Sequence, residues 1–355
     1  MTGSSPFSYQ KIYDTTRART LRSLLLTQES LDALASARGV REVIMLLDAS
    51  SLRDYLDLTG VDDETSFRSA LSNYLHRVFD SLTVLTSDFE RYFLDLYPLR
   101  RELEVYKQIL GLWLQGRLEE DRDSIPSTQI FSEKVLDTFS GRDAFTLVDI
   151  PLPTPLLRGL PTKISEVRSE TTPEGINEVF NLLDKNYYTL LWDTAIGQAD
   201  ASLLKELIGL EIDVTNIERV LRGLNLNIER EKIVKQLIPI YFRISEEALT
   251  SVLRSRSVEE AFLNLPSTRY DELLQSAFSA FSESSRVSEF SYSFKSFIIR
   301  NMYRFFSRKS FSVSILAALL RLELFQIDVL ETIYRSKSIG LDKEDTLNLI
   351  RYFTV

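Results

Sequence analysis

The sequence contains no cysteine and only one histidine, His76, among its 355 residues. Without cysteine there are no disulfide bonds and no thiolate metal sites. A zinc site built from several imidazoles is excluded as well, because no second histidine exists to complete it. Glycine (12) and proline (10) are scarce, and this scarcity favours long helices over turn-rich structure.

The sequence also lacks a long hydrophobic run. Its most apolar stretch, residues 313–320, is followed at once by Arg321 and then by Glu323, whereas a membrane-spanning helix needs roughly 20 apolar residues. Residues 1–9 have neither the basic region nor the apolar stretch of a signal peptide. We therefore expect no transmembrane segment.

The composition is typical of a folded, soluble protein. Hydrophobic residues make up 44% of the chain and charged residues 26%, which is ordinary for globular domains. A length of 355 residues suits two or three domains better than a single core. The net charge of −9 argues against a surface built throughout for nucleic acid, and the absence of cysteine fits a cytosolic protein.

Hydrophobic residues recur at helical spacing along most of the sequence, so the predicted fold class is all-α. Pro98 should kink the helix in which it lies or mark its true start. The proline-rich residues 149–173 are expected to form a loop or an extended segment. Good N-cap residues precede four short helices, at Thr27, Ser245, Ser257 and Asp342. The longest expected helices cover residues 67–85, 90–114, 199–224, 287–308 and 315–334.

A helix expected near the middle of the chain, residues 211–222, has weak sequence similarity to two other segments. Each of these lies about a third of the chain away, one on either side. Leu99 corresponds to Ile217 at a separation of 118, and Leu330 corresponds to it at a separation of 113. This period predicts three copies of one helical module, with the acidic residues 119–123 at the first boundary. The three similar helical domains would be residues 1–122, 123–228 and 229–355.

One face of the repeated helix should be buried. Apolar residues at positions i, i+3 and i+4 lie on the same side of a helix and pack inward together. The predicted core residues are Ile217, Val220, Leu221, Leu330 and Ile333.

No catalytic, cofactor-binding or metal site is predicted. To act as a general base, His76 would need a serine or cysteine motif, and none accompanies it; a helix-surface or half-buried residue is the preferred interpretation. Neither G-x-x-x-x-G-K-[ST] nor G-x-G-x-x-G occurs, so a phosphate-binding loop is missing. Residues 119–123 are acidic enough for Mg²⁺ or Ca²⁺ but lack the spaced ligands and turn glycine of a calcium loop, and a solvated linker is preferred.

Residues 286–309 are the most basic segment, with aromatic residues interleaved and one acid, Glu289. Such a pattern can bind single-stranded nucleic acid by stacking and phosphate contact, or an anionic membrane surface. The preferred interpretation is a long helix that buries Phe294, Phe297 and Ile298 and turns its cations toward solvent or a partner. The basic residues are Arg286, Lys295, Arg300, Arg304, Arg308 and Lys309.

Three groups of residues form a pattern that spans nearly the whole chain. They are Tyr13-x-x-x-Arg17-Ala18-Arg19-x-Leu21-Arg22-x-x-Leu25, Glu211-x-Asp213-x-x-Asn216-Ile217-x-x-Val220-Leu221-Arg222, and Leu237-Ile238-Pro239 followed by Ile244-Ser245-x-x-x-Leu249-x-x-x-Leu253. Together they resemble the C subunit of the archaeal A-type ATP synthase, a relative of the d subunit of vacuolar ATPases. The number of repeats agrees with this resemblance.

The resemblance implies a funnel-shaped protein of three helical domains with pseudo-threefold symmetry, no cofactor and no catalytic activity of its own. Such a protein lies peripherally on the cytoplasmic face of the cell membrane. It docks on the proteolipid ring, and its cavity receives the foot of the central stalk during ion-coupled ATP synthesis. Nucleic acid is not an expected partner.

Two other functions stay open at this point. One is a helical adaptor that binds nucleic acid or an anionic membrane surface through residues 286–309. The other is an enzyme with an unrecognised site of converging carboxylates, although the sequence shows no such pairing.

Overall fold

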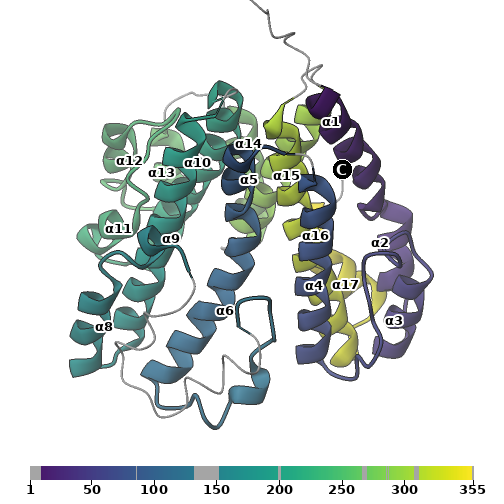
Figure 1. Cartoon of the computed structure of the whole chain (residues 1–355). Helices are drawn as coiled ribbons and strands as arrows, with labels where there is room; N and C mark the ends of the chain where they lie inside the picture. The colour runs from purple at the N-terminus through teal and green to yellow at the C-terminus, as the bar shows by residue number, and fades with distance from the viewer. Residues whose placement is uncertain are drawn as a thin grey trace, which may run out of the picture.

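The computed structural model describes residues 9–84, 86–131, 152–198, 201–265, 270–284, 286, 288–307 and 312–353. Regular structure in these residues is entirely helical, with no strand among them, so the predicted all-α fold class is confirmed (Figure 1). The α-helices are α1 (Tyr9–Leu21), α2 (Gln28–Ala35), α3 (Val40–Asp48), α4 (Glu64–Thr83), α5 (Asp88–Leu94), α6 (Leu96–Leu114), α8 (Leu160–Ser169), α9 (Pro173–Ile196), α10 (Ala201–Asn225), α11 (Arg230–Gln236), α12 (Glu246–Val252), α13 (Val258–Asn264), α14 (Asp271–Ser284), α15 (Ser288–Ser307), α16 (Val313–Ser338) and α17 (Lys343–Ile350). Short 3-10 turns accompany them: η1 (Arg22–Leu24), η2 (Arg122–Ser124), η4 (Thr154–Leu157) and η5 (Arg351–Phe353).

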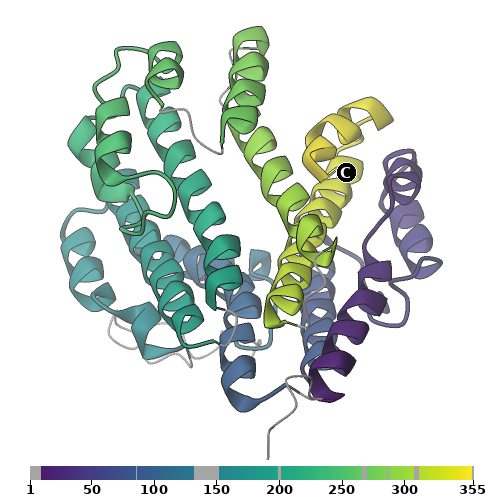
Figure 2. The same ribbon diagram turned by 90° about the horizontal axis from the view of Figure 1, so that it is seen from above.

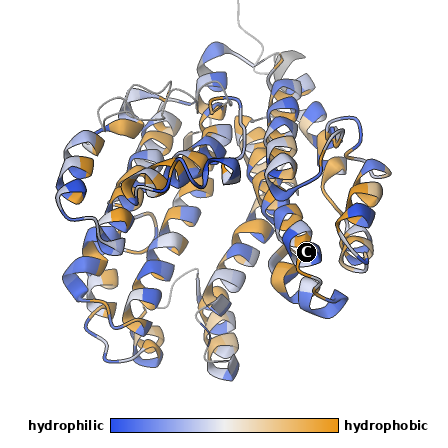
Figure 3. Cartoon of the chain, turned by 90° about the horizontal axis from the view of Figure 1, so that it is seen from below, coloured by the Kyte–Doolittle hydropathy of each residue, from blue (hydrophilic) through white to orange (hydrophobic). Residues whose placement is uncertain are grey.

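The core runs between the long helices, and α16 lies at its centre. This helix contacts α1, α3, α4, α6, α10, α15 and α17. Buried apolar side chains of these helices form one core cluster, and hydrophobic and hydrophilic stretches alternate along most helix ribbons (Figure 3). The predicted core residues are confirmed, with exposed fractions of 1% for Ile217 and Val220 and 0% for Leu221, Leu330 and Ile333.

Short polar side chains set the starts of many helices. Thr27, Ser245, Ser257 and Asp342 each accept a hydrogen bond from a backbone N–H of the first turn that follows, as predicted. These caps satisfy amide groups that have no partner within the helix. Pro98 is the third residue of α6, so it marks the beginning of a helix rather than a kink in one.

The expectation of a loop or extended segment at residues 149–173 was wrong where the structure describes them. Residues 149–151 lie outside the described residues, but Thr154–Leu157 is a 3-10 turn and α8 covers Leu160–Ser169. The prolines are compatible with these elements because Pro161 lies in the first turn of α8 and Pro173 begins α9. A first-turn residue needs no intrahelical N–H bond, and proline is well suited to that position.

Two helix pairs far apart in the sequence share the same local contacts. Between α2 and α3, the backbone N–H of Arg38 donates to the carboxylate of Glu42 at 2.8 Å. Between α12 and α13, the N–H of Arg256 donates to Glu260 at 2.7 Å. The corresponding residues lie 218 positions apart, as do the capping residues of α2 and α12. The two pairs are therefore built by the same local rules.

The N-terminal helices pack against the C-terminal ones. α1 and α3 contact α16, and α2 contacts α17; the purple and yellow ends of the chain lie side by side in Figure 2. In the same way α11, α12 and α13 contact α10, which precedes them in the sequence. The chain thus closes on itself through a non-covalent seam between its first and last helices.

We predict that Ile217→Ala lowers the free energy of unfolding by about 2–5 kcal/mol, because the truncation leaves a cavity in the core. Ile196→Ala is the matched control, since Ile196 is 50% exposed and should change stability by less than about 0.5 kcal/mol. Denaturant titration of both variants measures the difference. Equal losses would contradict the assignment of Ile217 to the core.

Candidate functional site

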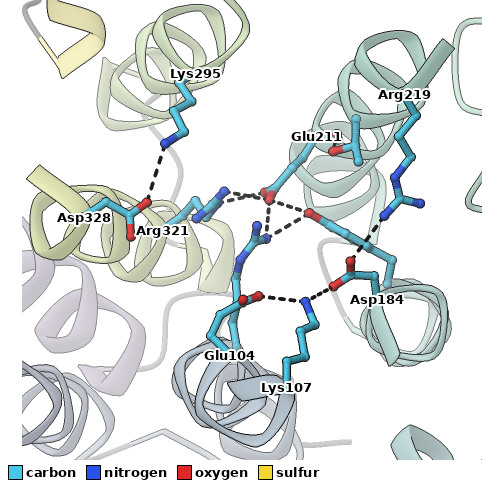
Figure 4. A network of polar contacts seen from close by, with 11 residues as sticks. Glu104, Lys107, Asp184, Glu211, Arg219, Lys295, Arg321 and Asp328 are labelled. Carbon is cyan, nitrogen blue, oxygen red and sulfur yellow. Dashed lines mark hydrogen bonds and ion pairs between the residues drawn. The ribbon is translucent and has the colours of Figure 1, made fainter. Parts of the chain in front are cut away.

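Four long helices, α6, α9, α10 and α16, meet at one buried carboxylate, that of Glu211 in α10 (Figure 4). Arg100 of α6 places its Nη1 atom 2.6 Å from Glu211 Oε1. Arg321 of α16 places Nε 2.9 Å from Oε2 and Nη2 2.8 Å from Oε1. Tyr188 of α9 donates its hydroxyl to Oε1 at 2.9 Å and accepts from Arg100 at 2.9 Å. These four residues are called the central cluster below.

Most of the central cluster is shielded from solvent, and only Arg100 has a substantial exposed part, 30% of its side chain. Glu211 is 3% exposed and Arg321 is 5% exposed, and the guanidinium carbon of Arg321 lies 4.0 Å from the centroid of the Phe325 ring. Burial alone would raise the pKa of Glu211, but Arg321 and Arg100 outweigh it and hold the pKa below its ordinary value. A buried charge with such partners cannot lose one of them without a large cost.

Each expected domain contributes one charged residue to the central cluster. Arg100 comes from residues 1–122, Glu211 from residues 123–228 and Arg321 from residues 229–355. Their sequence separations are 111 and 110 residues, a more even spacing than the 118 and 113 expected from the sequence similarity.

A second line of ion pairs joins α6, α9 and α10 beside the central cluster (Figure 4). Lys107 Nζ lies 2.6 Å from Asp184 Oδ1, and Arg219 Nη2 lies 3.3 Å from Asp184 Oδ2. Burial lowers the pKa of Lys107, but Asp184 and Glu104 outweigh it and leave the pKa above its ordinary value. Lys107 therefore stays charged although only 9% of it is exposed.

Ion pairs also fasten α16 to α4 and α6. Glu331 of α16 pairs with Arg101 of α6 and with Arg68 of α4, whose Nε atom is 3.5 Å away. One turn further along α16, Arg335 pairs with Glu64 at 2.6 Å. Because Arg101 follows Arg100 directly, two adjacent arginines of α6 bind two different long helices.

The Asp-x-x-Asn pattern of the repeated helix holds the turn that follows α11. Asn216 clamps the backbone of Ile238, since its amide donates to the carbonyl at 3.0 Å and its oxygen accepts from the N–H at 2.8 Å. Asp213 accepts the N–H of Phe242 at 3.0 Å and the hydroxyl of Tyr270 at 2.8 Å. These buried polar residues therefore have a structural role in fixing an irregular segment against α10.

His76 is half-buried, as preferred from the sequence, and its Nε2 atom lies 3.2 Å from Glu102 Oε1. The other oxygen of Glu102 accepts the hydroxyl of Thr128 at 2.5 Å. The contact links α4 to α6.

In the acidic residues 119–123, Asp121 pairs with Arg117 at 2.5 Å. No group of three or more His, Cys, Asp or Glu residues in the described part of the chain is arranged to hold a metal ion.

The basic residues 286–309 correspond to α15 and its flanks. Phe294, Phe297 and Ile298 are buried, which confirms the preferred interpretation. Lys295 and Arg300 pair with Asp328 and Glu272 at 3.9 and 3.5 Å; Arg308 and Lys309 lie outside the described residues. The aromatic rings of α15 that belong to the core are not available to stack on bases; they are those of Phe290, Phe294, Phe297, Phe305 and Phe306.

An open groove lies between the start of α2 and the end of α15. Its volume is about 530 Å³, and its lining includes Arg22, Arg304, Tyr303 and Phe353. Arg22 stacks on the rings of Tyr303 and Phe306, with centroid distances of 5.2 and 5.1 Å. Tyr303 and Arg304 are the residues of the basic segment that line this groove.

These contacts define a class of protein: an all-helical scaffold whose interior charges join helices to one another. In the described residues no helix is both long and apolar enough to cross a membrane. The charged groups of the central cluster pair with one another and so join α6, α10 and α16. This arrangement is typical of a structural component.

The chain belongs to the ATP synthase (C/AC39) subunit family, whose model matches residues 15–349. It is 20% identical over 349 residues to the C subunit of the A-type ATP synthase of Methanocaldococcus jannaschii, a match that covers 95% of this chain and 85% of that protein. It is 26% identical over 250 residues to the corresponding protein of Methanococcoides burtonii, covering 68% of this chain and 67% of that protein. The resemblance found in the sequence is confirmed.

We predict that Glu211→Ala lowers the free energy of unfolding by about 3–5 kcal/mol, because it leaves the buried guanidinium group of Arg321 and the partly buried one of Arg100 without their shared carboxylate. Glu104→Ala is the control: the side chain of Glu104 is 53% exposed, so losing its pair with Lys107 should cost less than about 1 kcal/mol. Thermal and denaturant unfolding measure both. A loss below about 1 kcal/mol for Glu211→Ala would show that the central cluster does not stabilise the fold.

Proposed function

We propose that this chain is a non-catalytic coupling subunit of an A-type ATP synthase, which links the central stalk to the proteolipid ring of the membrane. Family membership supports the assignment to the complex. The observation that carries the coupling role is the central cluster, because one carboxylate ties together helices from all three expected domains. A part that transmits torque must resist shear between its domains, and close-packed helices joined by buried, paired charges have that property.

We also propose that the three expected domains are copies of one module arranged around a pseudo-threefold axis, giving a funnel. The even spacing of the central cluster, 111 and 110 residues, supports this arrangement. The matching contacts of the α2–α3 and α12–α13 pairs support it as well. A threefold funnel is a suitable adaptor because it can face a ring of identical hairpins on one side and a single shaft on the other.

In this role the protein lies peripherally on the cytoplasmic face of the cell membrane, and it takes part in ATP synthesis coupled to hydrogen-ion transport. The alternative function, a nucleic-acid or anionic-membrane adaptor acting through residues 286–309, is less well supported. Much of the aromatic surface that it requires is buried, and Lys295 and Arg300 already have acidic partners.

Mixing the purified chain with the stalk subunits and with detergent-solubilised proteolipid ring should give complexes that co-elute on size exclusion. Apolar burial within a funnel should make the stalk complex resistant to moderate salt, whereas binding to phosphates weakens steeply as salt rises. Failure to bind either partner at micromolar concentration and low salt would contradict the coupling role. Salt-sensitive binding to single-stranded nucleic acid instead would favour the alternative.

The isolated chain should neither hydrolyse ATP nor bind it tightly, because its sequence has no phosphate-binding loop. Isothermal calorimetry with ATP should show no stoichiometric binding, and phosphate release should stay at the buffer level. Hydrolysis that persists at constant specific activity through further purification would overturn this prediction.

A further inference from the structure

A fully buried carboxyl group lies where the N-terminal helices pack against α16. Glu323 is 0% exposed. Its Oε2 atom accepts the hydroxyl of Tyr74 in α4 at 2.7 Å and the side-chain amide of Gln326 at 3.1 Å. Its other oxygen, Oε1, is buried and has no hydrogen-bond partner among the described residues. An ionised carboxylate in this setting would be strongly disfavoured, because both donors serve one oxygen and no cation of the described chain pairs with it.

Gln326 connects this carboxyl group to the beginning of the α2–α3 pair. Its amide nitrogen also donates to the Tyr74 hydroxyl at 3.1 Å. Its oxygen accepts the backbone N–H of Leu26 at 2.6 Å, and Leu26 directly precedes the residue that caps α2. One hydrogen-bonded group, called the latch below, therefore joins α4, α16 and the start of α2; it consists of Leu26, Tyr74, Glu323 and Gln326.

The groups that face Glu323 do not supply a compensating charge. Tyr74 approaches from α4, and Tyr303 of α15 is close enough for Glu323 to raise its pKa, although burial is the larger cause. Arg22 of η1 lies over the ring of Tyr303, with its guanidinium carbon 5.2 Å from the ring centroid. On α16 itself, Arg321 is engaged with Glu211. Burial raises the pKa of Tyr74 well above its ordinary value, with a further contribution from Glu323, so Tyr74 remains a neutral donor.

We propose that Glu323 makes closure of the seam between the N-terminal helices and α16 dependent on a bound proton. In its neutral form the latch is intact and Gln326 holds Leu26. Ionisation puts an uncompensated charge among these residues, and the seam opens so that water can solvate it. Opening and closing of the seam is then a property of the isolated chain. It does not depend on the proposed role in an ATP synthase.

The direction of the pH effect follows from the difference between the pKa of Glu323 in the closed seam and its pKa in the opened chain. Burial raises the pKa of Glu323 from its ordinary value of 4.5 to about 8, against the smaller effect of the hydrogen bonds from Tyr74 and Gln326. Between these two pH values the closed seam retains a proton that the opened or unfolded chain releases. Stability therefore falls as pH rises through this window and levels off above about pH 8.

Hydrogen exchange at the Leu26 amide tests the proposal, after correction for the intrinsic exchange rate. In the wild-type chain the opening equilibrium should rise by about tenfold per pH unit between pH 6 and 8 and then level off. In Glu323→Gln, which is neutral at every pH, the rise should disappear. Glu29→Gln removes an exposed carboxylate from α2 and should keep the wild-type rise.

A wild-type opening equilibrium that does not change with pH, or the same rise in Glu323→Gln, would overturn the proposal. Infrared spectroscopy of the wild-type chain provides a measurement that does not require a folded variant. The band of a protonated carboxyl group should be present at pH 7 and lost by pH 9.5. Absence of such a band at pH 7 would equally overturn the proposal.

Discussion

The fold depends on the sharing of one carboxylate, that of Glu211, between two arginines from distant parts of the chain. Arg100 and Arg321 are far from it in sequence and close to it in space. The guanidinium group of Arg321 could not be buried alone, because it would be a charge without a partner in a medium of low polarity. That of Arg100 is buried in part. The relative positions of α6, α10 and α16 are therefore fixed by a requirement for charge balance in addition to apolar packing. The ion pairs of Glu331 and Asp184 extend the same principle to α4 and α9.

This mode of construction suits a component of a rotary machine. Close packing of apolar side chains already resists deformation, but the hydrophobic attraction itself is non-directional. Buried ion pairs have defined geometry and lose much of their stabilisation when displaced by an ångström or two. A scaffold that combines both resists sliding as well as separation. The interior chemistry thus supports the proposed coupling role.

Much of the helical architecture is predictable because its signals are local. The caps at Thr27, Ser245, Ser257 and Asp342 and the apolar face of α10 follow from residue type and spacing, and the structure confirms them. The proline-rich residues 149–173 mislead because proline is compatible with the first turn of a helix as well as with a loop. Helices α9 and α14 are also absent from the helices expected from the sequence.

The central cluster is not predictable in the same way. Charged residues such as Arg100 and Glu211 usually lie on the solvent face of an amphipathic helix. Their pairing depends on the tertiary structure and cannot be predicted from a single sequence. A signal does exist in α16. Arg321 and Glu323 interrupt its most apolar stretch and so argue against a membrane span, yet charges on a helix with apolar residues on every side are also a sign of buried pairing.

The hydrogen bond between Leu26 and Gln326 joins residues 300 positions apart, and this has a consequence for biosynthesis. The first helices leave the ribosome long before α16 and α17, the surfaces on which they pack, have been made. During most of translation the faces of α1, α2 and α3 that pack on α16 and α17 must therefore remain exposed or be covered by a chaperone. The N-terminal helices are synthesised first but complete their packing last. Folding is therefore complete only after α16 and α17 have been made.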